Sequence, residues 1–532
     1  MRRTLRAWAA ATALTLMTAP AARAALDELP MRLPAASSAR AATAAQPSSW
    51  LVGARPAAAT ARIARAHGAR RLEQDSVFRL PAARARAFAA DLRRAGTLTY
   101  AEPNVRLRRM SAFDADPQGG PRRAIVDPGL NPPPPGDAAI AVIDTLVDTT
   151  LPDLSHVRQV NPGPVPGPHG TMVASAAAGQ LNGSGVFGVF PGAPVLSYGL
   201  PQELTCGDAA DAIVAAAEAE ARVINLSFGA PDSCGTLFVA VQIAYAAGSL
   251  VVAAAGNEFA QGNPVIFPAA YPHVLSVAAI GADGRATDFS NENTAVDVAA
   301  PGVGVPVATP RAFDDDGVAD GVTLADGTSF SSPMVAGAAA WLATVRPKLS
   351  NGQLADVLRR SALDLAPAGY DPGTGFGLVR MSGALAAPTP ARDVLEPNDA
   401  IFFVNGTVFD EPDPFIWRGS GKRRLSGTAD RVEDPVDIYR IRVPGKARFA
   451  IRLRPRRGDP DLFVYRGSAR TTDDTSRRLA RSTRGPKKTD SVGLVNGSRR
   501  ARTMYVVVGV SVDGGGTLDA AYRLELQRLK RR

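Results

Sequence analysis

A run of nine residues without a charge, Met334 to Leu342, constrains the fold of this chain more than any other stretch. The run is rich in alanine and has no polar face, which predicts a helix that is buried on all sides. It follows the small-residue turn Gly327-Thr328-Ser329. Ser329 is therefore expected at a helix start, where free backbone N–H groups and the helix dipole favour developing negative charge. The alternative is that Ser329 only caps the helix.

The middle of the chain alternates between strand-like and helix-like patterns. Strand-like runs cover Ala138 to Ile143, Val195 to Tyr198, Val223 to Leu226, Leu250 to Ala254 and Val274 to Ile280, and helical patterns cover Asp208 to Ala221, Gly235 to Ala247 and Gln353 to Ala362. This alternation predicts an α/β fold, a parallel sheet with helices on both faces.

A serine hydroxyl becomes a good nucleophile only when a base takes its proton. Of the four histidines, His169 is the best candidate because it begins a loop-to-helix junction of small residues, His169-Gly170-Thr171. Asp144 follows a buried strand, at the sheet edge where α/β sites form, and could fix the tautomer of such a base. The alternatives are a histidine that caps a helix and an ordinary aspartate in a turn after a strand.

The order Asp144, His169, Ser329 resembles that of the subtilisin-like serine peptidases. Four motifs carry the resemblance: Ala141-Val142-Ile143-Asp144-Thr145, His169-Gly170-Thr171, Ala253-Ala254-Ala255-Gly256-Asn257, and Gly327-Thr328-Ser329 followed by Pro333. They lie in a region of similarity from about residue 125 to residue 390. Leu146, Met172 and Ser175 depart from the family pattern, but none of these replaces a catalytic group.

The resemblance implies a serine endopeptidase that hydrolyses peptide bonds through an acyl-enzyme and needs no cofactor for its chemistry. Asp144, His169 and Ser329 would form the triad, and the Asn257 amide would help to bind the oxyanion. The pocket walls implied for the residue before the scissile bond are Ser227, Phe228, Gly229, Ala253, Ala254, Ala255 and Gly256. Their apolar character favours hydrophobic substrate residues, although Phe228 can equally be a packing residue.

The N-terminal part predicts a secreted precursor. Residues 1–24 combine arginines, an apolar stretch and Ala22-Arg23-Ala24, as expected of a signal peptide. Residues 25–113 form a small α/β pattern that resembles the inhibitory propeptides of secreted subtilases, and the alternative is an accessory domain that stays attached. A Pro-rich linker at 114–137 and the catalytic domain at 138–387 follow. No later segment resembles a membrane span, so we expect an extracellular or periplasmic protein, acting as a monomer.

Two features of the catalytic domain concern its stability. Cys206 and Cys234 are the only cysteines, and in a secreted protein such a pair favours a disulfide over two free buried thiols. The loop containing Asp314, Asp316 and Asp320 offers several carboxylates that could bind a structural calcium ion. A solvated acidic turn is the alternative, because the loop lacks the terminal glutamate of an EF-hand.

The character of the chain changes after a short linker at 388–394. Residues 395–532 contain many short β-like runs and predict a β-sandwich. Glu396-Pro397-Asn398-Asp399, Asp437-Ile438-Tyr439 and Asp459-Pro460-Asp461-Leu462 resemble motifs of the bacterial pre-peptidase C-terminal domain. This part carries 29 basic and 17 acidic residues, whereas residues 121–390 carry 11 basic and 24 acidic residues.

This charge distribution helps to predict which molecules the protein binds. The overall charge of +10 does not indicate nucleic-acid binding, because the catalytic region is acidic. A basic N-terminal segment would be attracted to that region as an intramolecular inhibitor. The basic loop from Ser476 to Lys488 could bind an anionic surface or simply be solvated. Two functions thus remain: a secreted endopeptidase acting on proteins, and an envelope binding protein whose peptidase core serves only self-processing.

Overall fold

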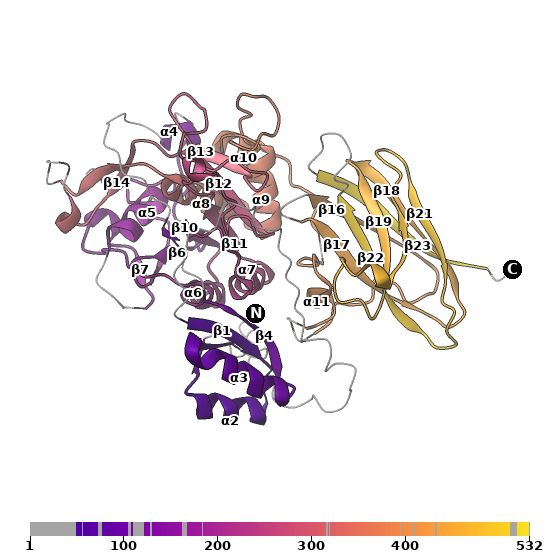
Figure 1. Cartoon of the computed structure of the whole chain (residues 1–532). Coiled ribbons are helices and arrows are strands. Elements are labelled where there is room, and N and C mark those ends of the chain that lie inside the picture. Colours follow the sequence, from indigo (N-terminus) through magenta and orange to yellow (C-terminus); the bar gives the residue numbers. More distant parts are fainter. Residues whose placement is uncertain are drawn as a thin grey trace. The chain divides into compact units, whose positions relative to one another are not determined.

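The computed structural model describes residues 49–530, except positions 56, 73–76, 105–107, 110–121, 128–129, 162–166, 183–184, 315, 317, 319, 394, 408, 410, 431–433 and 511–518. The predicted signal peptide lies outside the described residues. The chain divides into two compact units, Met1–Ala391 and Arg392–Arg532 (Figure 1). Among the described helices, none has the length and apolar character needed to cross a membrane.

The first unit begins with a small α/β domain. Its antiparallel sheet has the order β2-β3-β1-β4, formed by Arg70–Arg71, Val77–Pro81, Ser49–Ala54 and Leu98–Pro103. Helices α2 (Ala58–His67) and α3 (Ala82–Arg94) belong to the same domain (Figure 1). Phe88 and Leu92 of α3 are buried in a common core with Val52 and Leu80 of the sheet. The small α/β fold predicted for this part is confirmed.

A seven-stranded sheet forms the centre of the first unit. All of its strand pairs are parallel. Its order is β13-β12-β11-β9-β6-β8-β7, formed by Val298–Pro301, Val274–Ile280, Leu250–Ala254, Val223–Leu226, Ile140–Asp144, Val195–Gly199 and Arg158–Gln159. Val142 and Val252 belong to the same core cluster as helix α8 (Thr328–Val345), whereas their strand neighbours Ile143 and Val251 are buried outside it. Because side chains alternate along a strand, the two sets face opposite sides of the sheet.

The helices of this unit pack in pairs. Helix α8 packs against α5 (Pro168–Ala178), and α6 (Cys206–Glu218) packs against α7 (Gly235–Ala247). The predicted buried helix is correct, since Met334 to Leu342 is buried throughout within α8. The unit also contains α4 (Arg122–Ile125), α9 (Asn351–Arg360), α10 (Met381–Ala386) and the antiparallel pair β14 (Val305–Ala308) and β15 (Val322–Ala325).

The predicted disulfide is present between Cys206 and Cys234, with Cα atoms 6.6 Å apart. Cys206 is the first residue of α6, and Cys234 directly precedes α7. The bridge therefore joins the N-terminal ends of two neighbouring helices. Helix α6 is further fixed by a capping box, in which Thr205 accepts from the Asp208 backbone N–H and Asp208 accepts from that of Thr205.

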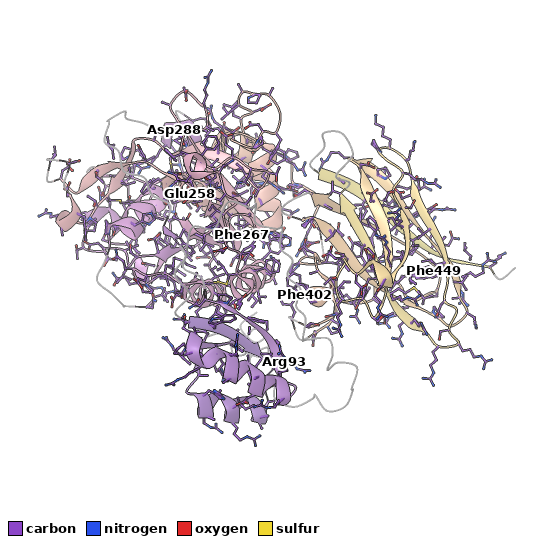
Figure 2. The ribbon with its side chains drawn as sticks, in the orientation of Figure 1. Arg93, Glu258, Phe267, Asp288, Phe402 and Phe449 are labelled. Carbon is purple, nitrogen blue, oxygen red and sulfur yellow. A yellow bond between two sulfur atoms is a disulfide. The ribbon has the colours of Figure 1, made fainter. Side chains whose placement is uncertain are left out.

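The second unit is a two-sheet β-sandwich, as predicted. One sheet has the order β16-β23-β18-β21, formed by Lys422–Asp430, Asp519–Leu529, Arg448–Arg457 and Asp490–Val495. The other has the order β17-β22-β19-β20, formed by Val436–Val443, Arg502–Val510, Pro460–Arg466 and Arg478–Ser482. Phe449 (Figure 2), Ile451 and Leu453 alternate with exposed or half-buried residues and form a core with Val506 of the facing sheet. A short helix, α11 (Ile401–Val404), precedes the strands.

Candidate active site

Three of the predicted site residues lie at ends of elements in the central α/β layer. Asp144 is the last residue of β6, His169 is the second residue of α5, and Ser329 is the second residue of α8. These elements leave the side chains at the carboxyl edge of the sheet and at the N-terminal ends of two helices. This is the edge at which parallel α/β sheets form their sites.

Asp144 and His169 are in direct contact. His169 Nδ1 lies 2.8 Å from Asp144 Oδ2, and both residues are buried. The other carboxylate oxygen, Oδ1, accepts from the Thr145 backbone N–H at 2.6 Å. An ionised carboxylate only accepts hydrogen bonds, so Nδ1 carries the ring hydrogen and Nε2 is left as an acceptor. Within the described residues, Nε2 of His169 is buried and has no hydrogen-bond partner.

The close approach of the His169 segment to the Asp144 segment depends on Gly170. A Cβ atom added to Gly170 would lie 1.9 Å from the carbonyl oxygen of Thr145. The Gly170 backbone N–H also donates to Thr145 Oγ1 at 2.7 Å. The residue after the histidine must therefore be glycine, because any side chain would push the His169 loop away from the Asp144 loop.

Ser329 is held by hydrogen bonds to Ser227. Its Oγ donates to the Ser227 carbonyl oxygen at 3.3 Å, and its own carbonyl oxygen accepts from Ser227 Oγ at 2.9 Å. Pro333, four residues later within α8, explains the second bond. Proline has no N–H to donate to the carbonyl four residues earlier, so the Ser329 carbonyl takes a donor from outside the helix.

Asn257 follows strand β11 and contacts the residue before the serine. Its Oδ1 accepts from both the backbone N–H and Oγ1 of Thr328, each at 2.9 Å. Within the described residues, its Nδ2 is buried and has no hydrogen-bond partner. Gly256, with a φ of +112°, makes the turn that brings Asn257 there. A buried amide donor is thus left available beside the start of α8.

The predicted pocket walls are placed in two segments. Ser227 lies between β9 and β10 (Phe228–Gly229), and Ala253 and Ala254 end β11, followed by Ala255 and Gly256. All seven residues are buried. Phe228 is fully buried, as its packing alternative requires. Strand β10 pairs antiparallel with β5 (Arg108–Arg109), so a segment that follows the N-terminal domain occupies the free edge of this wall.

The N-terminal domain contacts the catalytic domain through residues to which the sequence analysis gave no role. The Glu102 carboxylate accepts from the backbone N–H groups of Gly235 and Thr236, at 2.9 Å each, and from Thr236 Oγ1 at 2.5 Å. It thereby caps the N-terminus of α7. Burial raises the pKa of Glu102 above its ordinary value, and these hydrogen bonds partly offset the effect.

Two further contacts involve the neighbouring helix α6. Asn104 Oδ1 accepts from the Gly207 backbone N–H at 3.1 Å, and Arg79 forms an ion pair with Asp208 at 2.9 Å. The only local signal for the Glu102 and Asn104 contacts was the motif Tyr100-Ala101-Glu102-Pro103-Asn104, which places polar side chains at the end of a strand.

In the acidic loop that the sequence suggested for calcium, the carboxylates accept hydrogen bonds from backbone N–H groups of the same loop. Asp314 accepts from the Gly321 backbone N–H, Asp316 from that of Val318, and Asp320 from that of Val322. Carboxylates that converge on one another among the described residues are found instead in the second unit. Calcium binding by the loop stays a prediction.

Comparisons with known proteins agree with this geometry. Residues 136–377 match the subtilase family. Over 260 residues the chain is 33% identical to Subtilisin from Bacillus pumilus, which covers 46% of this chain and 90% of that protein. It is also 33% identical over 260 residues to Subtilisin amylosacchariticus from Bacillus subtilis subsp. amylosacchariticus, covering 46% of this chain but only 65% of that protein.

One solved structure extends the likeness to most of the chain. The crystal structure of fervidolysin from Fervidobacterium pennivorans, described as a keratinolytic enzyme related to subtilisin, covers 89% of this chain and 93% of its own, with a TM-score of 0.56. At 18% sequence identity this likeness concerns the fold alone. Together with the match to the Bacillus pumilus protein, the family match shows that this chain belongs to the subtilase family.

Proposed function

We propose that this protein is a secreted serine endopeptidase, made as a precursor that processes itself. The observation that carries the proposal is the 2.8 Å contact between His169 Nδ1 and Asp144 Oδ2, which leaves Nε2 as a buried acceptor. A neutral histidine held in this tautomer is the base that a serine nucleophile needs.

In the proposed reaction, Ser329 attacks the peptide carbonyl while His169 Nε2 takes the hydroxyl proton. Asp144 stabilises the imidazolium that forms. The Asn257 Nδ2 group and the Ser329 backbone N–H donate to the tetrahedral oxyanion, and one such donor contributes about 3 kcal/mol. His169 then protonates the leaving amine, and water hydrolyses the acyl-enzyme by the same steps in reverse order.

Substrates would bind as an added strand along β10. The pairing of Arg108–Arg109 with Phe228–Gly229 supports this, because it shows that an extended chain fits that edge. The buried alanines Ala253, Ala254 and Ala255 favour a hydrophobic residue before the scissile bond. The substrates are therefore proteins or peptides in an extended conformation, with no cofactor in the chemistry.

The N-terminal domain would act as the intramolecular inhibitor. Its Glu102 and Asn104 bind the N-terminal ends of α7 and α6, and the chain that follows pairs with the substrate wall. Residues 25–113 would thus occupy the enzyme until the segment is cut and degraded. Export to the extracellular space or the periplasm rests on residues 1–24.

The test compares the wild-type protein with Ser329→Ala, following intact mass and casein hydrolysis. We expect the wild type to lose its N-terminal segment and digest casein, and the variant to stay full-length and inert. A wild type that stays full-length and inert under maturing conditions would favour the alternative of a binding protein with a peptidase core. Mixing active wild type with the variant separates self-cleavage from cleavage by another molecule.

A further inference from the structure

The outer face of one sheet in the second unit is lined with basic side chains. This sheet consists of β16, β23, β18 and β21, and residues such as Leu453 and Leu524 point from it into the core of the sandwich (Figure 1). Because side chains alternate along a strand, the neighbours of these core residues point outward. The outward-facing basic residues are Lys422, Arg424, Arg448, Arg452, Arg454 and Arg523. In the cross-strand rows that contain them, the one acidic residue is Glu525.

The strand register places two of these arginines side by side. Arg454 of β18 lies directly opposite Arg523 of β23. Like charges in this position destabilise a sheet. Among the described residues, neither Arg454 nor Arg523 forms an ion pair, and the same is true of Arg452. The sheet therefore keeps positive charge that costs stability, which favours a role in binding an anionic partner.

The side chain of Glu525 organises the cations without neutralising the face. Its carboxylate pairs with Lys422 at 3.1 Å and with Arg424 at 3.0 Å, and its side chain is only 7% exposed beneath them. The hydrogen bond from Lys422 lowers the pKa of Glu525 more than burial raises it, and the charges of Arg424 and Arg454 lower it further. Glu525 therefore stays ionised and fixes the nearest basic side chains, while most of the positive charge remains.

Two exposed apolar side chains lie at one end of the same face. Arg448 is directly opposite Val495 of β21 on one side and Leu529 of β23 on the other. Val495 is 55% exposed and Leu529 is 37% exposed. In the described part of the second unit, no other large apolar side chain is exposed to this degree. Basic residues beside exposed apolar residues are typical of surfaces that lie in a lipid headgroup layer.

The loop before β21 extends the basic surface. Asp490 begins β21 and pairs with the residue before Arg454, so the loop reaches the sheet beside Arg454. The Asp490 carboxylate accepts from the Arg484 backbone N–H at 3.0 Å, which fixes the start of the loop. The side chains of Arg484, Lys487 and Lys488 are exposed. The position of this loop next to the basic face favours anion binding over simple solvation.

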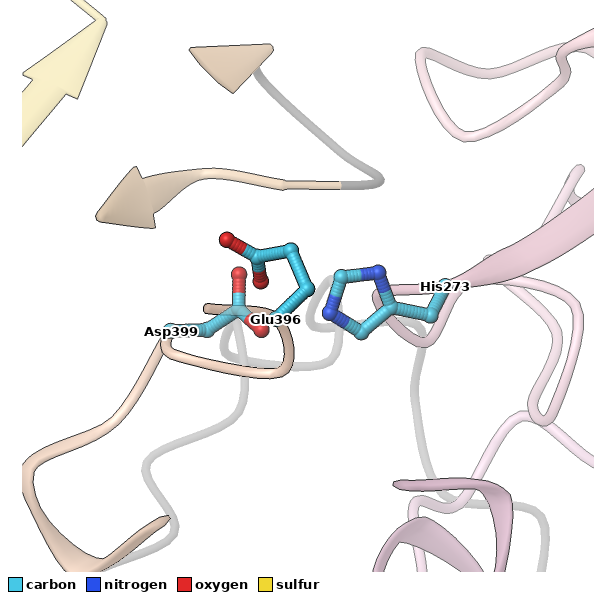
Figure 3. Close-up of side chains that lie close together, drawn as sticks. All are labelled: His273, Glu396 and Asp399. Carbon is cyan, nitrogen blue, oxygen red and sulfur yellow. The ribbon is translucent and has the colours of Figure 1, made fainter. Parts of the chain in front are cut away.

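The acidic residues of the unit gather at another place. Four carboxylates each offer one oxygen, and these oxygens lie within 4.8 Å of one another: Asp393, Glu396, Asp434 and Asp437. Figure 3 shows Glu396 with the neighbouring Asp399. Asp430, the last residue of β16, accepts from the Asp434 backbone N–H at 3.3 Å. This acidic region thus adjoins the end of β16 that is opposite to Lys422, and it leaves the basic face unbalanced.

We propose that the outer face of the β16-β23-β18-β21 sheet binds the surface of an anionic phospholipid membrane. The basic residues occupy three adjacent strands, so their charges are spread over a plane and are not aligned along a groove. All but Lys422 are arginines, whose guanidinium groups bind phosphate through two parallel hydrogen bonds. Val495 and Leu529 enter the headgroup layer, a contact that a soluble polyanion does not offer. This binding belongs to the second unit and does not depend on peptidase activity.

The test uses the full chain with the Ser329→Ala substitution, so that self-cleavage cannot obscure the result. Sedimentation measures partition into vesicles of phosphatidylcholine mixed with phosphatidylglycerol, with vesicles of phosphatidylcholine alone as the reference. Each basic residue at a membrane surface strengthens partition about fivefold, so Arg452→Gln combined with Arg454→Gln should weaken it at least tenfold. Added salt should weaken the partition of the parent protein, because salt screens these charges.

A matched control separates this face from the overall charge of the protein. Arg442→Gln combined with Arg481→Gln removes the same charge from the outer face of the other sheet. This control pair should change partition far less than the first pair. Both pairs should unfold at the temperature of the parent, because the substituted arginines are exposed and form no ion pairs among the described residues.

A second readout locates the contact, because the basic N-terminal segment can attract the same vesicles. Val495→Trp places an indole at the apolar end of the face, and brominated phosphatidylglycerol should quench its fluorescence beyond the quenching seen in the parent. The indole of Arg442→Trp, on the other sheet, should not be quenched. The proposal is overturned if the indole at position 495 is not quenched, or if both arginine pairs weaken partition equally. It is also overturned if heparin binds through Arg452 and Arg454 while vesicles do not, because the face would then recognise a sulfated polysaccharide.

Discussion

The side-chain oxygen of Asn257 accepts two hydrogen bonds from Thr328, one from the backbone N–H and one from the hydroxyl, each at 2.9 Å. This arrangement fixes the amide so that its oxygen faces the start of α8. The nitrogen Nδ2 then remains buried and without a partner among the described residues. This buried donor is therefore available to a further acceptor, which is consistent with the oxyanion role proposed above.

The first prediction follows from this donor. Asn257→Asp keeps an oxygen for Thr328 but replaces the donor by an oxygen, whereas Asn257→Leu removes both. We expect kcat to fall by about 10²- to 10³-fold in Asn257→Leu, and at least as far in Asn257→Asp, with KM nearly unchanged. Steady-state kinetics on a peptide substrate measures both constants. A nearly active Asn257→Asp variant would mean that the amide only supports Thr328.

The second prediction concerns the maturation cut. The antiparallel pairing of Arg109 with Phe228 runs towards Ser227, whose carbonyl oxygen is 3.3 Å from Ser329 Oγ. The next residue in the chain is Met110, which lies outside the described residues. We expect cleavage after Met110, three residues before the boundary at 113 that the sequence suggested, giving a first mature protein that begins at Ser111. N-terminal sequencing at early times checks this, and a first cut more than two residues away would contradict the register.

The third prediction is a pH dependence of inhibition by the N-terminal domain. The pKa of Glu102 is raised in the complex, so binding takes up a proton. Inhibition should therefore be strongest below the ordinary pKa of 4.5 and weaken as the pH rises through the raised pKa. In Glu102→Gln this slope should disappear, because a side-chain amide does not titrate in this pH range.

The inhibition constant of the separate N-terminal segment, measured from pH 4 to 8, tests this prediction. Asp91→Asn is a suitable control, because Asp91 contacts His67 and Arg94 within the N-terminal domain. It should change the stability of the segment without changing the pH slope. A slope that persists in Glu102→Gln would assign the titration to another group.

The fourth prediction concerns the disulfide. Replacing Cys206 and Cys234 together by alanine opens a loop between residues 28 positions apart. We expect a loss of about 2 to 4 kcal/mol in the free energy of unfolding, because the unfolded chain regains the freedom that the bridge removed. Denaturant unfolding of the Ser329→Ala protein, with and without reductant, measures the loss. Reduction should destabilise the protein by the same amount as the double substitution, and should have no effect on the double variant.

The sequence predicted best the parts of the candidate site whose position depends on residues adjacent to them in the chain. Asp144 at a strand end, His169 before Gly170, and Ser329 before a charge-free helix are local patterns, and each predicted the element that carries the residue. The alternation of apolar strands and helices predicted the parallel sheet. In these cases the local chemistry restricts the fold to few solutions.

Other contacts depend on distant pairings that no local pattern encodes. Glu102 caps a helix that begins more than 130 residues later, and its carboxylate could have faced solvent. The acidic run at Asp314 drew attention to calcium because its charges are close in sequence. The four convergent carboxylates of the second unit are instead separated into two pairs, joined only when β17 folds against the segment before it. A run of acidic residues in the sequence is thus a poor predictor of which carboxylates lie close together in the folded protein.

The bonds between Ser227 and Ser329 have a consequence for attempts to alter the protein. Ser227 belongs to the wall that would grip a substrate, and it holds the carbonyl that Pro333 leaves without a helical donor. A substitution at Ser227 would therefore change the proposed substrate wall and the position of Ser329 at the same time. An engineer who wishes to retarget cleavage should therefore leave Ser227 untouched.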